Sequence, residues 1–318
     1  MSYIEKKSVN NKKYIYFVKK VSFMNKFLVI KESMGIESPT MNKEKYLLDN
    51  LDKISNKELL FRKTFLNQIK DKISHNENLP EKIEIKAINI NNLIEGKKAS
   101  DIIENEFAKE FIFNSNNIEG SKIPPERVRE IIDTGDSKYK DRNEVKEVKN
   151  SIIAYKYLKK SFKFNLQSIK RLYYILTKDL VREGNQPYPK GFKKEQNIVN
   201  NSSTTAPEKV EEELKDLMKW YNKNKNNLHP LILSFEFHRR YELIHPFLDG
   251  NGRTGRLIMN KILLNSGYFP IIIYKSSKQA YFNAIEKSKE GKLKNYYQFI
   301  LEQADKSYDY ILEVLKKY

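Results

Sequence analysis

The segment from His238 to Leu257 reads HRRYELIHPFLDGNGRTGRL, and the rest of the chain is organised around it. Between His245 and Arg256 it gathers residue types that are scarce elsewhere in the sequence. This short stretch holds one of the four histidines, three of the eleven glycines, an aspartate and two arginines. Such a concentration predicts a functional loop between two helices, with the remaining chain as its support.

The sequence DGNGR at residues 249–253 predicts an anion site. We expect Gly250 and Gly252 to adopt positive φ angles and to turn their N–H groups inward, while the following helix adds its positive N-terminal dipole. Arg253 and Arg256 are three residues apart, so they share one face of that helix and place two guanidinium forks beside the loop. Together these groups predict a site for two or three phosphates.

Two further residues of the loop suggest phosphate chemistry. Asp249 is a hard oxygen ligand suited to a Mg²⁺ ion that bridges phosphates. His245 is neutral near pH 7 and suited to take a proton from an attacking hydroxyl. Because the chain has no cysteine and the motif no serine, we expect direct transfer to an outside hydroxyl. Taken singly, Gly-Asn-Gly-Arg is typical of a turn and a histidine before proline of a structural residue, so the conjunction carries the argument.

The bulk composition excludes several classes of protein. With 318 residues, 39% hydrophobic and 12% aromatic, the chain has enough apolar content for one large or two modest domains. The absence of cysteine rules out disulfides and thiolate metal sites. No apolar run approaches the roughly 20 residues that span a bilayer, and MSYIEKKSVNNKKY lacks the apolar segment of a signal peptide. We therefore expect no membrane association and a cytoplasmic protein.

The net charge of +18 is compatible with nucleic-acid binding, but its distribution disfavours that partner. The lysines are scattered, and Lys, Asn and Ile are abundant together, which is typical of genome-wide compositional bias. Arginine is more informative: there are ten arginines against 49 lysines, and four of the ten lie between residues 239 and 256. That choice favours bidentate binding of carboxylate or phosphate within the motif.

The periodicity of apolar residues predicts a mainly α fold of eight to ten helices around a central pair, residues 231–244 and 253–266. A β-hairpin is expected over residues 13–31, and a small hairpin flap within residues 190–206. After Pro80, EKIEIKAINI alternates like a short strand. Further helices are expected within 42–73, from an N-cap at Ser100 to a stop at Gly120, after Pro125, and over 142–160, 166–182, 207–223, 281–289 and 293–318.

The motif HPFLDGNGRTGR matches without gap the HPFx(D/E)GNGRxxR signature of Fic-domain proteins. The preceding HPLILSFEFHRRYELIHPF resembles that family's central helix, and KGFKKEQNIV followed by TTAPEKVEEELKDLMKWY is similar to its flap and the helix after it. The resemblance covers about residues 100–300. It implies a Fic-type helical bundle over residues 96–318 and leaves residues 1–95 as an accessory region.

The resemblance implies transfer of AMP from ATP to a Ser, Thr or Tyr hydroxyl of a target protein, with pyrophosphate leaving and Mg²⁺ as cofactor. Phe247 would be buried and orient the loop. In one departure from the family, Gly191-Phe192-Lys193-Lys194 stands where the flap usually carries an arginine after Gly-x-Tyr. The implied roles are His245 as general base, Asp249 as Mg²⁺ ligand, Gly250, Asn251 and Gly252 as phosphate cradle, Arg253 on the neighbouring phosphates and Arg256 on the γ-phosphate.

A second motif precedes the main one. Residues Ser115 to Gly120 read SNNIEG and match the (S/T)xxxE(G/N) motif that resembles the inhibitory helix of the same family, here at about residues 100–119, in its class II arrangement. Ser115 and Glu119 are four apart and share a helix face. We hypothesise that Glu119 pairs with Arg256 and removes the γ-phosphate clamp. The same glutamate could instead orient a water that removes AMP from a modified target.

Two alternatives to AMP transfer remain open. One is another nucleotidyl or phosphate transfer at the same site, such as UMP transfer. The other is a non-catalytic nucleic-acid-binding protein in which the motif is a relic. The partner implied by the first reading is a protein substrate of unknown identity, with the chain itself as one candidate, and the sequence leaves open a homo-oligomer.

Overall fold

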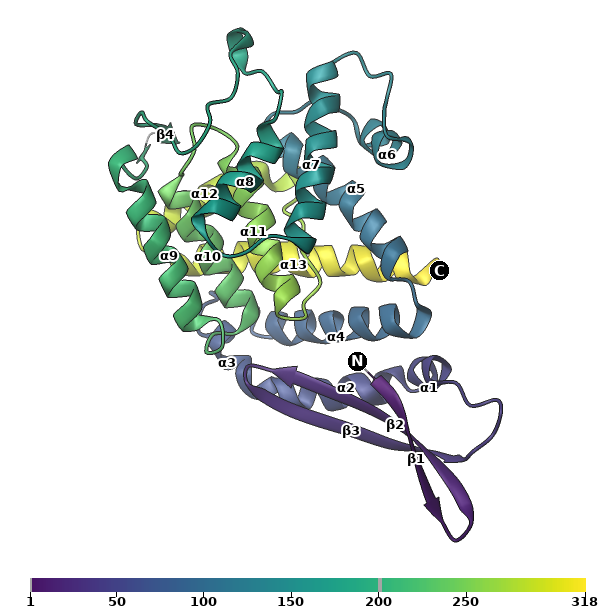
Figure 1. Cartoon of the computed structure of the whole chain (residues 1–318). Helices are drawn as coiled ribbons and strands as arrows, with labels where there is room; N and C mark the ends of the chain where they lie inside the picture. The colour runs from purple at the N-terminus through teal and green to yellow at the C-terminus, as the bar shows by residue number, and fades with distance from the viewer. Residues whose placement is uncertain (1, 200–201) are drawn as a thin grey trace.

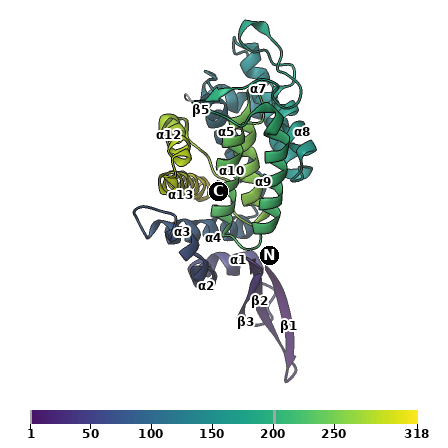
Figure 2. The same cartoon turned by 90° about the vertical axis from the view of Figure 1, so that its left-hand side faces the viewer.

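The computed structural model describes residues 2–199 and 202–318. At its centre, two packed helices lie on either side of the motif loop. Helix α10 (Pro230–Ile244) packs against α11 (Asn251–Asn265), as the sequence predicted. Figure 2 shows α12 (Lys278–Lys289) and α13 (Leu293–Lys316) on one side of α10, with α8 (Leu166–Thr177) on the other. Because α10 is covered on several sides, apolar residues occupy more than one of its faces.

The fold is mainly α, as predicted, but the N-terminal hairpin is part of a larger sheet. Strands β1 (Ser2–Val9), β2 (Lys12–Phe23) and β3 (Lys26–Ile36) form an antiparallel sheet in that order. The predicted turn joins β2 to β3, with positive φ at both Met24 and Asn25. The sequence analysis missed β1 because most of its residues are exposed and polar, which leaves no apolar alternation to recognise.

The expected strand after Pro80 is wrong, because residues 79–97 form helix α4 (Leu79–Lys97). Pro80 lies in its first turn, where a missing N–H costs nothing. Glu84 and Lys86, which produced the apparent alternation, lie on buried parts of the helix, where Arg62 and Asp305 pair with them. Because distant partners allow these charged side chains to be buried, the charges do not mark the exposed face of the helix, and the sequence resembles that of a strand. Before α4, residues 42–73 form α1 (Lys43–Asp49), α2 (Leu51–Arg62) and α3 (Asn67–Lys70).

Helix α4 joins the N-terminal layer to the helical body. It packs along α13, and Figure 1 shows it between that helix and the layer of sheet, α1 and α2. A buried cluster strengthens the joint: Arg62 donates to Glu84 at 2.9 Å, and the hydroxyl of Tyr268 donates to Glu84 at 2.6 Å. The sheet lies at the end of the molecule opposite the flap strands in both views (Figures 1 and 2), so it is remote from the motif.

Most of the remaining helices lie where they were expected, but the described residues form thirteen α-helices rather than eight to ten, and two helix boundaries differ. Ser100 is not the N-cap of α5, because the helix is preceded by Ala99 and no side chain caps it; α8 ends at Thr177 rather than at residue 182, and Asp179 beyond it has a positive φ. The bounds are α5 Ser100–Ile118, α6 Pro125–Thr134, α7 Arg142–Lys160 and α9 Val210–Asn224, with 3-10 turns at Lys63–Phe65, Glu183–Asn185, Pro207–Lys209 and Lys275–Ser277.

The flap is a short hairpin, as predicted. Strand β4 (Ile198–Val199) pairs antiparallel with β5 (Ser202–Ser203). The division of the chain at residue 95 into an accessory region and a Fic-type helical bundle stays a prediction. None of the helices in the described part of the chain combines the length and the apolarity that a membrane span requires.

Candidate functional site

The motif forms the loop between α10 and α11 together with the first turn of α11. His245 is the C-cap of α10 and has a φ of 51°, in the left-handed region. Gly250 is the N-cap of α11 with a φ of 76°, so the helix begins at Asn251 rather than at residue 253. The N–H groups of this first turn have no intrahelical acceptors, and the helix dipole adds positive potential there. The predicted anion site therefore lies at the N-terminus of α11.

Phe247 and Asn251 hold the loop in shape. Phe247 is fully buried, as expected, and its ring stacks on Tyr173 with centroids 3.9 Å apart. The side chain of Asn251 accepts a hydrogen bond from the N–H of Phe247 at 2.8 Å and donates one to its carbonyl at 2.8 Å. Both ends of the Asn251 amide are thus used to hold the loop, and its backbone N–H faces no intrahelical acceptor.

Arg256 is buried and contacts both residues of the second motif. Its guanidinium donates to Glu119 Oε1 at 2.7 Å and to the carbonyl of Ser115 at 2.9 Å, and its Nε donates to Ser115 Oγ at 3.1 Å. Burial opposes the charge on Arg256, but Glu119 beside it holds the pKa above its ordinary value. The hypothesised contact between Glu119 and Arg256, 137 positions apart, is therefore present in the structure.

Gly252 is required for a different reason from the one predicted. Its φ is not positive, since it lies within α11, and only Gly250 has the left-handed conformation. A Cβ atom built on Gly252 would lie 2.2 Å from Glu119 Oε1 and 2.8 Å from Arg256 Nη1. The missing side chain thus makes the space in which the Glu119 carboxylate meets the arginine.

This geometry predicts a coupling between positions 252 and 119. We expect Gly252→Ala to destabilise the protein by about 1–3 kcal/mol, since the new methyl overpacks the ion pair. In a Glu119→Gly background the same substitution should cost less, because the contact with the carboxylate is gone, alanine favours the helix by about 0.5 kcal/mol, and only the 2.8 Å approach to Arg256 Nη1 remains. Urea unfolding of the four proteins in the cycle measures the difference. Equal costs in both backgrounds would mean that Glu119 does not occupy this space.

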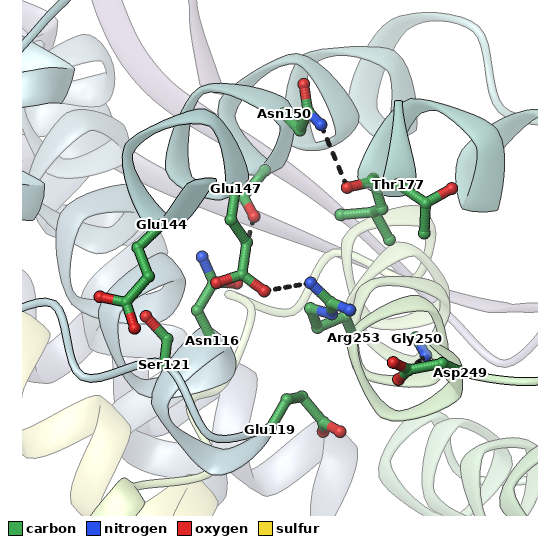
Figure 3. A network of polar contacts seen from close by, with 12 residues as sticks. Asn116, Glu119, Ser121, Glu144, Glu147, Asn150, Thr177, Asp249, Gly250 and Arg253 are labelled. Carbon is green, nitrogen blue, oxygen red and sulfur yellow. Dashed lines mark hydrogen bonds and ion pairs between the residues drawn. The ribbon is translucent and has the colours of Figure 1, made fainter. Parts of the chain in front are cut away.

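Arg253 has a partner that the sequence analysis missed. Its guanidinium forms a buried ion pair with Glu147 of α7. Figure 3 shows Glu147 and Asp249 on opposite sides of Arg253, with Glu119 on a third side. Burial raises the pKa of Glu147, whereas the carboxylate keeps the pKa of Arg253 raised despite its burial. No local sequence signal marks Glu147, because only the packing of α7 on α11 brings it to the site.

His245 is half-buried between the ammonium of Lys193 and the carboxylates of Glu119 and Asp249. The pKa of His245 is lowered to about 4. Burial is the main cause, and the nearby ammonium of Lys193 contributes to the same shift. The imidazole is therefore neutral at physiological pH, the state that a general base needs. The sequence analysis chose His245 correctly as a residue neutral near pH 7, but Lys193 was noted only as a departure from the flap pattern.

The flap is hydrogen-bonded to the motif at two points. The N–H of Lys193 donates to the carbonyl of Pro246 at 2.9 Å, and the Asn197 amide donates to the carbonyl of Phe247 at 3.1 Å. The ammonium of Lys193 in turn donates to Asn197 Oδ1 at 2.8 Å and to Thr204 Oγ1 at 2.5 Å. These contacts hold the flap against the two residues that follow His245.

Asp249 lies at the mouth of the site and is partly exposed. Its Oδ1 accepts a hydrogen bond from the N–H of Gly250 at 2.5 Å. Within residues 2–199 and 202–318, no three His, Asp or Glu side chains cluster in a way that could hold a metal ion. A single hard oxygen next to a phosphate cradle fits Mg²⁺, which takes most of its ligands from phosphates and water.

A cavity of about 160 Å³ joins the two motifs. Glu119, Gly252 and His245 contribute to its wall, so the glutamate shares one space with the histidine. Thr204 of the flap and Tyr281 of α12 close it from two other sides, and the ring of Tyr281 lies 5.9 Å from the Arg256 guanidinium. The structure thus brings together residues from α5, the flap, the motif and α12.

Glu242 contributes a second, largely buried carboxyl to the wall of this cavity. Burial raises the pKa of Glu242 to about 8, and its Oε1 has no hydrogen-bond partner among the described residues. A Cβ atom on Gly255 would lie 2.4 Å from that oxygen, which accounts for the third glycine of the motif. The sequence analysis assigned no role to either residue, since the spacing alone does not bring them together.

Comparison with known proteins finds a family model that matches the region of this site. Residues 163–263 match the model of the Fic/DOC family. The chain is 29% identical over 212 residues to a protein named protein adenylyltransferase Fic from Drosophila mojavensis, covering 63% of this chain and 40% of that protein. The chain thus spans about two fifths of the length of the curated relatives it matches.

Solved structures support the fold. A Fic family protein from Desulfovibrio desulfuricans G20 aligns with a TM-score of 0.63 at 24% identity, over 74% of each chain. A Fic domain containing signaling protein from Bacteroides thetaiotaomicron aligns with a TM-score of 0.61 at 21% identity, over 70% of this chain and 91% of that one. The helical arrangement around the motif is therefore that of Fic proteins.

Proposed function

Because the chain carries a Fic/DOC domain over residues 163–263, we propose that it is a self-inhibited protein adenylyltransferase. It transfers AMP from ATP to a Ser, Thr or Tyr hydroxyl of a target protein. One observation carries the proposal: the half-buried His245, the partly exposed Asp249 and two buried arginines meet at the N-terminus of α11. The curated relatives named protein adenylyltransferase support the choice of AMP as the transferred group.

The proposed reaction assigns a task to each residue. The target hydroxyl attacks the α-phosphorus as His245 takes its proton, a new O–P bond forms, and pyrophosphate leaves with the electrons of the broken P–O bond. The N–H groups of Gly250, Asn251 and Gly252 cradle the phosphates, Arg253 binds those next to the transferred group, and Arg256 binds the γ-phosphate. A Mg²⁺ ion on Asp249 would neutralise phosphate charge.

Inhibition follows from the contact between Glu119 and Arg256. While Nη2 of Arg256 donates to Glu119 at 2.7 Å and Nε donates to Ser115, these two nitrogens are not available to a γ-phosphate. Its carboxylate also repels phosphate from the cavity that it shares with His245. Glu119 is close enough to this cavity to orient a water instead, which supports removal of AMP as a second activity of the same site.

The buried state of His245 predicts an unusual pH profile. We expect kcat/KM of the Glu119→Gly protein to stay level between about pH 5.5 and 7.5, because the base loses its proton near pH 4 rather than 6.5. Removing the negative charge of Glu119 should lower the pKa further. A stopped labelling assay at fixed ionic strength measures the profile. A half-maximal rate near pH 6.5 would contradict the assigned environment.

The same pKa affects stability, and its sign follows from linkage. The folded pKa of about 4 lies below the ordinary histidine value of 6.5, so the unfolded state binds more protons between the two. The contribution of His245 to stability is therefore complete above pH 6.5 and is lost as the pH falls toward 4.

Labelled nucleotides test the proposed function directly. We expect α-labelled ATP with Mg²⁺ to label protein, and UTP, GTP and CTP to label it less. A preference for UTP would replace AMP by UMP as the transferred group and keep the site. We further propose that the protein acts in the cytoplasm on a protein target, the chain itself included, and that residues 1–95 form an accessory region, with a homo-oligomer as one possible assembly.

A further inference from the structure

Lys193 differs from every other buried cation that the structure describes. Its side chain is almost completely buried, yet its ammonium bonds only to neutral oxygens, those of Asn197 and Thr204. In the described part of the chain, each of the other buried lysines and arginines has a carboxylate within ion-pair distance. These pairs are Lys19–Glu58, Arg62–Glu84, Lys86–Asp305, Lys109–Glu106, Arg253–Glu147 and Arg256–Glu119.

A buried charge without a counter-charge is costly. Removing an ammonium from water costs several kcal/mol, and neutral hydrogen bonds recover only part of that. Burial alone lowers the pKa of Lys193 to about 8, so the group remains largely charged at neutral pH. A buried charge with such a cost is typical of a functional site, where a bound anion offsets the cost.

The position of Lys193 indicates which anion that is. Its ammonium bonds to Thr204, which lines the cavity shared by Glu119, Gly252 and His245. On its other side, Lys193 lines a groove of about 370 Å³ formed with Phe192 and Leu248 at the base of the flap. It thus lies between the cavity at the helix N-terminus and the outer groove of the flap.

The backbone N–H of Lys193 donates to the carbonyl of Pro246 at 2.9 Å, which places Lys193 beside the residue that follows His245, and its ammonium helps to lower the pKa of the imidazole. A phosphoryl group attacked by a hydroxyl that His245 deprotonates must therefore lie within reach of the same positive charge. Arg253 and Arg256 are already paired with carboxylates, whereas Lys193 has its full charge available.

We propose that Lys193 is a further catalytic residue, whose ammonium binds the phosphoryl group that is transferred beside His245. The inference rests on the proposed AMP transfer. As the O–P bond forms and pyrophosphate leaves, negative charge on the non-bridging oxygens of that phosphoryl is offset by Lys193. The hydrogen bonds to Asn197 and Thr204 hold the ammonium in place before the nucleotide binds.

A purely structural role for Lys193 predicts different behaviour. If the side chain only tied the flap to the motif, its loss would loosen the flap and weaken AMP and adenosine binding alike. If it binds the phosphoryl group, its loss weakens AMP specifically. The ratio of the two affinities separates the roles without requiring catalysis.

The experiment compares AMP and adenosine binding by calorimetry in the Glu119→Gly protein, with and without Lys193→Met. We expect Lys193→Met to reduce the preference for AMP over adenosine about tenfold and to lower kcat for labelling about 100-fold, as the loss of one preorganised donor does. Lys193→Arg keeps the charge and should restore part of the preference. Lys194→Met, which removes the exposed neighbouring ammonium, is the matched control and should leave the ratio unchanged.

Thermal unfolding shows whether Lys193→Met remains folded, which we expect, because methionine fills the space without a buried charge. An unchanged AMP preference in Lys193→Met overturns the inference, and so does a parent protein that binds AMP no better than adenosine. The proposed function fails on a separate observation, namely no transfer of label by the Glu119→Gly protein with its lysine intact.

Discussion

Replacing Glu119 with glycine should raise the transfer of AMP to protein by about 100-fold or more. Breaking a buried pair on one side typically costs 3–5 kcal/mol, so the paired state of Arg256 is expected to dominate in the unmodified chain. Since each factor of ten corresponds to about 1.4 kcal/mol, release of the guanidinium should raise the rate of AMP transfer by two or three orders of magnitude. Glu119 is itself partly exposed, with 22% of its side chain accessible, and solvent weakens its ion pair. We therefore expect an increase at the lower end of this range.

The measurement is incorporation of α-labelled ATP into the protein itself and into a lysate, compared at equal concentrations. Glu126→Gly is a matched control, because it removes an exposed carboxylate near the start of α6 that lies outside the cavity. Labelling by Glu119→Gly that does not exceed that of the unmodified chain would end the inhibitory assignment. The labelled lysate protein would be the first candidate for the target.

Substituting His245 with alanine in the Glu119→Gly protein is expected to reduce labelling by about 10²–10⁴-fold, the range for loss of a general base. His245 is the residue of the cavity wall best suited to accept the hydroxyl proton near pH 7, since burial lowers its pKa to about 4. ATP binding should persist, because the phosphate contacts come from α11.

Labelling rates in single turnover, together with the Kd for ATP, separate the two effects. His75→Ala serves as the control, since this histidine has an exposed side chain at 67% and lies outside the cavity. Sustained labelling by the His245 variant would remove the histidine from the role of base. Loss of ATP binding as well as labelling would instead indicate that the loop had collapsed.

The parts of the fold that were predicted correctly depend on local patterns. Residues 142–160 form α7 at those bounds, and the turn at Met24 and Asn25 has the positive φ angles expected of a two-residue hairpin. Helix period and turn chemistry involve residues close in sequence, so they can be seen in the sequence. Helix α4 was misread because Glu84 and Lys86 obtain their partners from distant elements.

The candidate site divides in the same way. The spacing of His245, Asp249, Arg253 and Arg256 within one motif is local, and the structure brings these residues together at one helix N-terminus. Glu119 was identified only through a resemblance. Glu147 and Lys193 have no signature of their own, since a buried glutamate and a buried lysine look like any others in a chain so rich in charge.

Sequence by itself determined a loop whose composition suits phosphates, with a histidine and an aspartate beside it, because backbone N–H groups, the helix dipole and side-chain spacing act within a few residues. Tertiary structure alone decided how the charges of that loop are balanced. Arg253 faces Glu147, Arg256 faces Glu119 through the space left by Gly252, and Lys193 faces no carboxylate among the described residues. The reason is physical: the effect of a buried charge depends on which distant side chains share its low-dielectric surroundings.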